Sequence, residues 1–176
     1  MVRVYKIFAY LLFFIMMLLV FIPKENLFYL LEKELAKEEL YISNERLKEE
    51  LFTLKIQNAS LSYKGIAFAD VQEIKSVFLF FYNEVSFKDM KLSSLLANYW
   101  PQKVQTGKIS YSVLNPLDLQ AVAKGDFGEI HAKYSLQKRV LKVFLTPSKL
   151  MLQKYRNSLR YFKKLKTGEY SYEKSL

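Results

Sequence analysis

A run of 16 uncharged residues, Ile7 to Ile22, constrains this chain more than any other feature. It reads IFAYLLFFIMMLLVFI and is preceded by Arg3 and Lys6. As an α-helix this run is about 24 Å long, which approaches the hydrocarbon thickness of a bilayer, about 30 Å. The sequence therefore predicts a cytoplasmic N-terminus and a single transmembrane anchor within residues 1–23.

Two other interpretations of this run are less favoured. A secretory signal has an apolar region of about 7–15 residues that ends in small side chains, whereas this run ends in the bulky sequence Phe21-Ile22-Pro23. We therefore expect the anchor to be retained. A helix packed on the core of a domain this small would keep a polar face toward solvent, and this run is apolar on all sides.

The charges that flank the run predict its orientation. Arg3 and Lys6 precede it, whereas residues 24–39 carry three Lys and five Glu. The positive-inside rule then predicts a single-pass protein of the inner (plasma) membrane, with its N-terminus cytoplasmic and its body periplasmic. The absence of cysteine is compatible with an oxidising compartment.

The rest of the chain has the composition of a folded domain. Hydrophobic residues make up 51% of the sequence and aromatic residues 16%. The about 150 residues after the anchor are enough for one domain with its own core. The formal net charge of +10 is unevenly placed, because residues 147–168 hold seven Lys and Arg and no Asp or Glu.

A helical pattern follows the anchor and then gives way to strands. Leucines at helical spacing between glutamates predict a juxtamembrane amphipathic helix over residues 24–39. This helix could pack on its own domain or pair with a second copy as a coiled coil, although its heptads are not sustained. From residue 40 the hydrophobic period approaches two, which is typical of strands.

Residues 40–146 are predicted to form an antiparallel β domain. Alternating segments at 107–113, 117–123, 130–136 and 140–145 are separated by tight turns, as in a β-meander covered on one face. Residues 77–82 read as one further, almost continuously apolar strand. The predicted fold class is thus mainly β with flanking helices: an N-terminal transmembrane helix, an open curved sheet or sandwich, and a C-terminal basic helix.

Residues 147–176 are predicted to form this basic amphipathic helix and a tail, with Thr146 as its cap. Its apolar stripe could dock on the domain's own sheet, or the helix could lie on a membrane surface, as basic amphipathic helices do. In the membrane case the contacting residues would be Lys149, Lys154, Tyr155, Arg156, Arg160, Phe162, Lys163, Lys164 and Lys166.

No motif in the sequence predicts catalysis. His131 is the only histidine, it alternates with Ile130 and Ala132, and we expect it on the polar face of a strand. The sequence has no cysteine, no phosphate-binding glycine loop and no spacing typical of metal ligands. We therefore expect a protein that is not an enzyme and has no cofactor or metal, and we expect no nucleic-acid partner for an exported domain.

A family resemblance rests on the order of several segments. They are PKENL at 23–27, LKIQNASLSYKGI at 54–66, VSFKDMKL at 85–92, GKI at 107–109 and GDFG at 125–128. With the anchor, this order resembles the type II secretion protein N family and the related AsmA-like envelope proteins of Gram-negative bacteria. The layout is also similar to that of lipopolysaccharide-transport protein C.

The resemblance implies two functions that the sequence leaves open. One is a non-enzymatic, inner-membrane-anchored periplasmic protein that assists envelope or secretion-system assembly through contacts with other components. The other is a lipid-binding or lipid-transfer module that holds acyl chains against an apolar sheet face. Candidates for such a ligand or partner face are Phe78, Phe80 and Tyr82.

Overall fold

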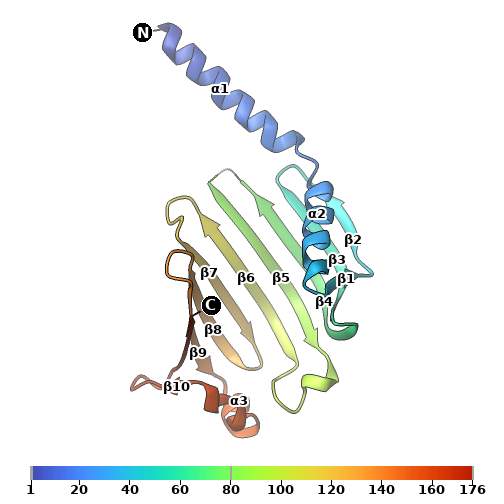
Figure 1. Ribbon diagram of the computed structural model, residues 1–176, viewed down its shortest axis with the longest axis vertical. Coiled ribbons are helices and arrows are strands. Elements are labelled where there is room, and N and C mark those ends of the chain that lie inside the picture. Colours follow the sequence, from blue (N-terminus) through green and yellow to red (C-terminus); the bar gives the residue numbers. More distant parts are fainter. Residues whose placement is uncertain (1, 80, 176) are drawn as a thin grey trace.

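The computed structural model describes residues 2–79 and 81–175. Eleven strands of this part of the chain form one antiparallel sheet, with helices at both ends (Figure 1). The helices are α1 (Val2–Phe21), α2 (Lys24–Lys37) and α3 (Lys149–Lys154), and the 3-10 turns are η1 (Ser94–Leu96) and η2 (Arg156–Tyr161). The strands are β1 (Leu40–Ser43), β2 (Arg46–Glu49), β3 (Thr53–Tyr63), β4 (Ile66–Phe78), β5 (Tyr82–Leu92), β6 (Lys103–Ser112), β7 (Asp118–Gly125), β8 (Gly128–Ser135), β9 (Val140–Pro147), β10 (Lys163–Lys164) and β11 (Tyr170–Ser175).

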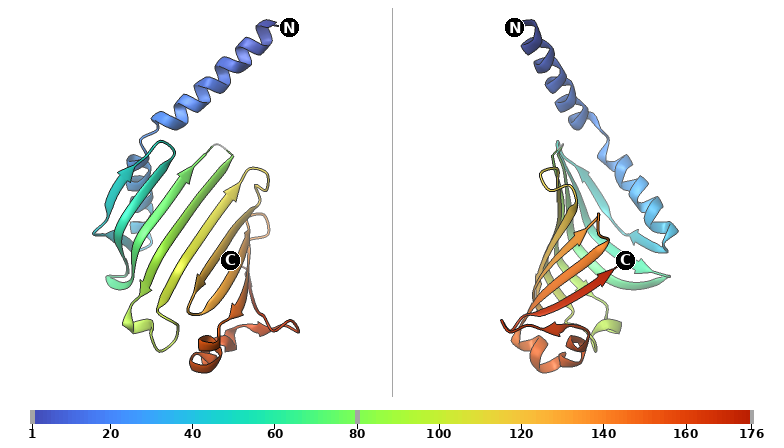
Figure 2. Two further views of the ribbon diagram at one scale, coloured as in Figure 1. Left: turned by 180° about the vertical axis from the view of Figure 1, so that it is seen from behind. Right: turned by 60° about the vertical axis from the view of Figure 1, so that its left-hand side comes forward.

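The predicted antiparallel meander is confirmed. From β3 to β9 each strand pairs with the next one along the chain, and the sheet continues from β9 to β11 and β10. At the other side both β1 and β2 pair with β3. The sheet stays open and curves strongly, with a concave face turned toward the viewer in Figure 1 and seen edge-on in the right-hand view of Figure 2.

Two residues with left-handed backbone keep the apolar side chains on this concave face. Leu54 and Ile56 are buried before Asn58, and Ala59 is buried after it, so the alternation shifts by one residue at Asn58. Asn58 has φ 56°, and Asp89 in β5 has φ 50°. Asn and Asp adopt this conformation more readily than most residues because their short polar side chains can form local hydrogen bonds.

Helix α1 projects away from the sheet (Figure 1). The side chains that face solvent along it range from Met17, 39% exposed, to Phe21, 76% exposed. Within residues 2–79 and 81–175, no helix combines the length and the apolar character required to cross a membrane. The predicted transmembrane span is therefore not supported.

Helix α2 packs on its own sheet, as one of the two sequence interpretations expected. Phe28 is 4% exposed and lies in a core cluster with Leu54, Ile56 and Ala59. Lys24, at the first turn, is buried, and its Nζ lies 3.1 Å from Glu49 Oε1 and donates to the Ile22 carbonyl at 3.3 Å. This partly buried ion pair, in which the Glu49 side chain is 33% exposed, fixes the start of α2 against β2.

The predicted basic helix from residue 147 onward is wrong. Ser148, not Thr146, caps a helix of only six residues, and its Oγ accepts a hydrogen bond from Met151 N at 3.0 Å. The chain then continues as η2, turns through β10 and returns as β11, so the sheet extends beyond residue 146.

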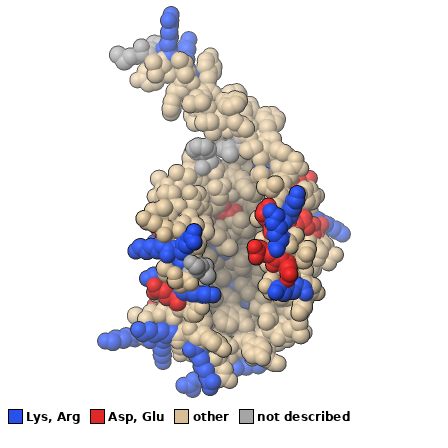
Figure 3. All heavy atoms as spheres, viewed as in Figure 1, with Lys and Arg blue, Asp and Glu red and all other residues tan. Residues whose placement is uncertain are grey.

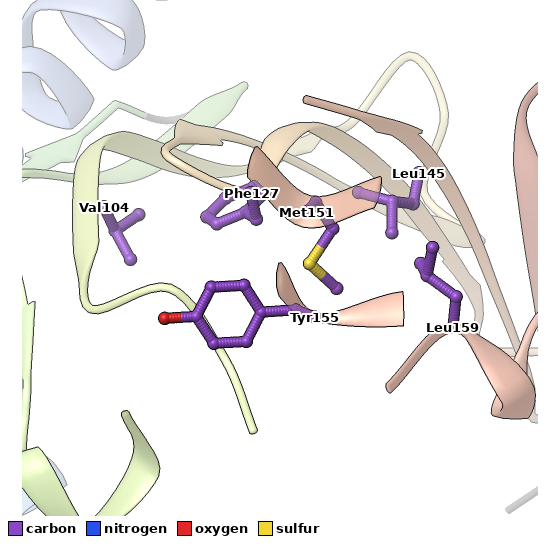
Figure 4. Packing of buried hydrophobic residues seen from close by; sticks show 6 residues of the cluster. All are labelled: Val104, Phe127, Leu145, Met151, Tyr155 and Leu159. Atoms are coloured by element: carbon purple, nitrogen blue, oxygen red, sulfur yellow. The ribbon is translucent and has the colours of Figure 1, made fainter. Parts of the chain in front are cut away.

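Packing explains why this helix is interrupted. Met151, Tyr155 and Leu159 point into one core cluster with Val104, Phe127 and Leu145 (Figure 4). To cover the end of a curved sheet with all three side chains the segment has to bend, and tertiary packing outweighs the helical pattern. The apolar stripe thus docks on the domain itself.

The predicted continuous strand at 77–82 is also wrong. Strand β4 ends at Phe78 and β5 begins at Tyr82, with Phe78 opposite Asn83 and a turn closed by Leu79 N and the Tyr82 carbonyl at 3.1 Å. A run of apolar residues therefore forms a hairpin turn. Phe80, Met1 and Leu176 lie outside the described residues.

Candidate functional site

The strand register arranges the concave face in three rows that cross the sheet. The first row contains Phe87, Gly107, Ala123, Ile130 and Leu145, and it packs against the core cluster formed with α3 and η2. This end of the concave face is therefore filled by the chain itself.

The second row is open. Val85, Ile109, Ala121, Ala132 and Val143 lie side by side on five neighbouring strands. Val85 is 42% exposed and Ile109 is 48% exposed, although both lie in the middle of an eleven-stranded sheet. The two alanines leave additional space, so this row forms an apolar floor that no other part of the described chain covers.

The third row continues this floor toward the end of the sheet where α1 leaves. It contains Asn83, Tyr111, Leu119, Tyr134 and Leu141, in register on the same five strands. Figure 3 shows that the concave face is hollowed here, with charged side chains gathered on the walls rather than on most of the floor. We call the surface made by the second and third rows the open groove.

The opposite face of the same strands is mostly polar and carries ion pairs, although Val122 and Phe144 also lie on it. Lys108 Nζ lies 2.6 Å from Glu84 Oε2, which also accepts a hydrogen bond from the Tyr82 hydroxyl. Burial alone would raise the pKa of Glu84, but the hydrogen bonds from Lys108 and Tyr82 outweigh it and hold this pKa below its usual value. The hydrogen bond to Glu84 in turn raises the pKa of Lys108.

A second cavity, of about 600 Å³, lies on this outer face between the turns after β6 and β8. Two ion pairs line it, Lys133 with Asp118 at 2.8 Å and Lys142 with Glu173 at 3.3 Å. Pairs of this kind are typical of a solvated strand surface.

In the part of the chain that the structure describes, no group of three His, Asp or Glu is arranged to hold a metal ion. His131 is exposed on β8, with its Nε2 3.1 Å from Glu129 Oε1. The hydrogen bond from Lys124 holds the pKa of Glu129 below its usual value, and His131 adds to this effect.

The candidate residues of the basic segment lie at the end of the sheet far from α1 (Figure 1). Tyr155 is 6% exposed and belongs to the core, so it cannot contact a membrane. Phe162 packs on the same core and on Tyr172, with ring centroids 5.7 Å apart. The cations remain exposed there, namely Lys149, Lys154, Arg156, Arg160, Lys163, Lys164 and Lys166.

Of the candidate aromatic face, the two described residues, Phe78 and Tyr82, lie on opposite sides of the sheet. Phe78 lies on the concave side, where it packs on the α2 cluster, whereas Tyr82 contacts Glu84 on the outer side. The open groove was not predicted from the sequence, although the alternation of Ile109 and Tyr111 does predict β6, one of the strands that form it. Which residues of neighbouring strands share a row across the sheet, and where the core stops, could not be predicted from that alternation.

Comparison with known proteins identifies no relative. No family model matches the chain, no curated protein matches its sequence, and no solved structure matches its fold. The resemblance to secretion protein N and AsmA-like proteins therefore stays a prediction.

Proposed function

We propose that this protein is a membrane-attached, non-enzymatic lipid-binding protein that assists assembly of the cell envelope. Helix α1 attaches it to the inner membrane, the body lies in the periplasm, and the open groove shelters acyl chains. One observation carries the proposal: an apolar row in the centre of the sheet, with Ile109 at 48% and Val85 at 42% exposure, has no cover within the described chain.

The shape and chemistry of the groove favour an acyl chain over a polar ligand. Its second row offers aliphatic side chains and two alanines, and the register supplies no charged side chain in that row between Val85 and Val143. Burial of apolar surface contributes about 0.8 kcal/mol for each methylene removed from water, without directional contacts. A flexible acyl chain can therefore bind here through the burial of apolar surface alone.

The exposed surface of α1 supports membrane attachment. Apolar side chains such as Phe8 at 66% and Phe13 at 59% exposure have no partner surface in the described chain. Insertion of this helix into a bilayer would remove them from water. Extraction with alkaline carbonate tests attachment, and protease access to each terminus distinguishes a helix that crosses the bilayer from one that lies in its plane.

The proposed orientation has its own test. A reporter that is active only in the periplasm, fused after Leu176, is expected to be active. An inactive reporter, together with an active cytoplasmic reporter at the same position, would place the body in the cytoplasm and contradict this part of the proposal.

Lipid binding is tested on the full chain, purified from membranes in mild detergent and analysed by lipid extraction and mass spectrometry. We expect about one phospholipid or lipopolysaccharide molecule for each chain. Ala121→Trp places an indole in the open groove and is expected to expel the lipid. Gln120→Trp, on the outer face of the same strand, is the matched control and is expected to retain it.

Two results would contradict the proposal. One is a wild-type chain that carries no lipid even after incubation with membranes. The other is an Ala121→Trp variant that folds, retains lipid as well as the wild type does, and is indistinguishable from Gln120→Trp.

A second candidate function, assembly through protein contacts, is favoured by the open edges of the sheet. Strand β1 and strand β10 each pair on one side only. An exposed edge can bind an extended segment of a partner by strand addition. A protein that copurifies with the chain in place of lipid, and that is lost when an edge strand is blocked by proline, would favour this function.

A further inference from the structure

The end of the sheet nearest α1 carries a set of exposed apolar turn residues. Strands β2, β4, β6 and β8 all end there, and each is joined to the next strand by a short turn. We call the described parts of these four turns, residues 50–52, 79, 81, 113–117 and 136–139, the rim. Its most exposed apolar side chains are Leu51 at 59%, Phe81 at 61%, Val113 at 49%, Leu114 at 95%, Leu117 at 49% and Leu136 at 43%.

Turn geometry does not require these side chains. The turn after β6 already contains Asn115 and Pro116, which suit a turn, and yet Leu114 and Leu117 flank them with their side chains in solvent. Single exposed apolar residues are ordinary on protein surfaces, but several gathered at one end mark a contact surface.

The attachment of α1 indicates what that surface contacts. Only Ile22 and Pro23 separate α1 from α2, a link of about 7 Å at full extension. Lys24 is buried at the start of α2 and bound to Glu49 beside the turn 50–52, so the link ends at the rim itself. Whatever α1 inserts into must therefore lie next to the rim.

The charge of the rim fits a lipid surface. Lys138 and Arg139 are exposed in the turn after β8, next to Leu136. The acidic residue in the turn after β2, Glu50, is bound by Lys55 at 2.7 Å. Apolar side chains flanked by cations are the arrangement that binds the interface of a bilayer with anionic lipids.

We propose that the rim docks on the bilayer that holds α1, and that the open groove begins at this contact. The third row of the groove lies directly behind the rim, since Tyr111, Leu119 and Tyr134 are within a few residues of its turns. A docked rim would let an acyl chain pass between bilayer and groove without crossing water. This inference rests on the proposed lipid-binding function.

The absence of cysteine allows a direct test with the full chain. A single cysteine at Leu114 or Leu136 is labelled with an environment-sensitive fluorophore, and the protein is reconstituted in vesicles of phosphatidylcholine and phosphatidylglycerol. Leu152, 43% exposed in α3 at the far end of the sheet, is the matched control. We expect a blue shift, and quenching by spin-labelled lipid, at the two rim positions and neither at the control.

The outcomes separate this inference from the proposed function. Rim positions that stay unquenched, or that shift only when another protein is added, overturn membrane docking even if lipid copurifies. Quenching at the rim of an Ala121→Trp variant that has lost its lipid supports docking independently of the groove. Quenching at the rim of a wild-type chain that never carries lipid leaves docking standing and removes the lipid-binding function.

Discussion

The contact between Phe87 and Gly107 divides the filled end of the concave face from the open groove, and it yields a quantitative prediction. A Cβ added at Gly107 would lie 2.0 Å from Cζ of the Phe87 ring and 2.3 Å from its Cε1. Carbon atoms in contact are about 3.5–4.0 Å apart, so in Gly107→Ala the ring must move by about 1.5 Å or more. Overpacking of this kind costs about 1–3 kcal/mol.

Gly107→Ala is expected to change the free energy of unfolding in the opposite direction when the Phe87 ring is absent. In a strand, alanine is favoured over glycine by about 0.5–1 kcal/mol, because alanine loses less backbone conformational entropy than glycine when the chain folds. Gly107→Ala should therefore destabilise the wild type and stabilise the Phe87→Ala variant, with a coupling energy of about 2 kcal/mol between the two sites. For a chain of this length 1 kcal/mol corresponds to about 2–4 °C in Tm.

The assay is urea unfolding of the full chain in detergent, followed by the fluorescence of Trp100. This is the only tryptophan, and it packs on Phe127 in the adjacent core, with ring centroids 5.7 Å apart. The reasoning is refuted if Gly107→Ala changes stability equally in both backgrounds, because the ring would then not occupy the space above the glycine.

Three further predictions concern other contacts. Phe28→Ala should cost about 3–5 kcal/mol and raise hydrogen exchange in α2, since the residue is 4% exposed between helix and sheet; unchanged exchange would contradict the packing of α2. Met151→Ala should cost about 2–5 kcal/mol in urea unfolding, because its side chain is fully buried, whereas a cost below about 1 kcal/mol would mean that α3 is not part of the core. Glu84→Gln should lower stability at pH 7, and the difference from wild type should fade as the pH falls below about 4.5, because a carboxylate with a lowered pKa contributes stability above that pH and loses it on protonation. A difference that grows toward acid pH would contradict the assignment of Lys108 as its partner.

The meander could be predicted because its signals are local. Ile109, Tyr111 and the strands that follow alternate regularly, and turn residues such as Asn115 and Pro116 stand between them. The curvature of the sheet could not be predicted, because it depends on how strands far from one another in sequence share one core. Asn58 and Asp89 shift the alternation in their strands, and neither looks different from a surface residue.

The segments predicted wrongly are those in which packing outweighs the local pattern. Met151, Tyr155 and Leu159 have helical spacing, but they bend the chain around the end of a sheet whose position the sequence does not show. The run around Phe78 is apolar enough for a strand, but it forms the turn between β4 and β5. In the groove, Val85 and Ile109 look like core residues in sequence, and only the fold shows that nothing in the described chain covers them.

Site-specific crosslinking in native membranes tests lipid binding by the open groove most directly. A photoreactive residue replaces either Ile109, on the concave face, or Gln120, which is exposed on the outer face of the neighbouring strand. We predict lipid adducts at position 109 and few or none at position 120. Equal labelling at the two positions, or protein adducts without lipid at position 109, would contradict an acyl-chain groove.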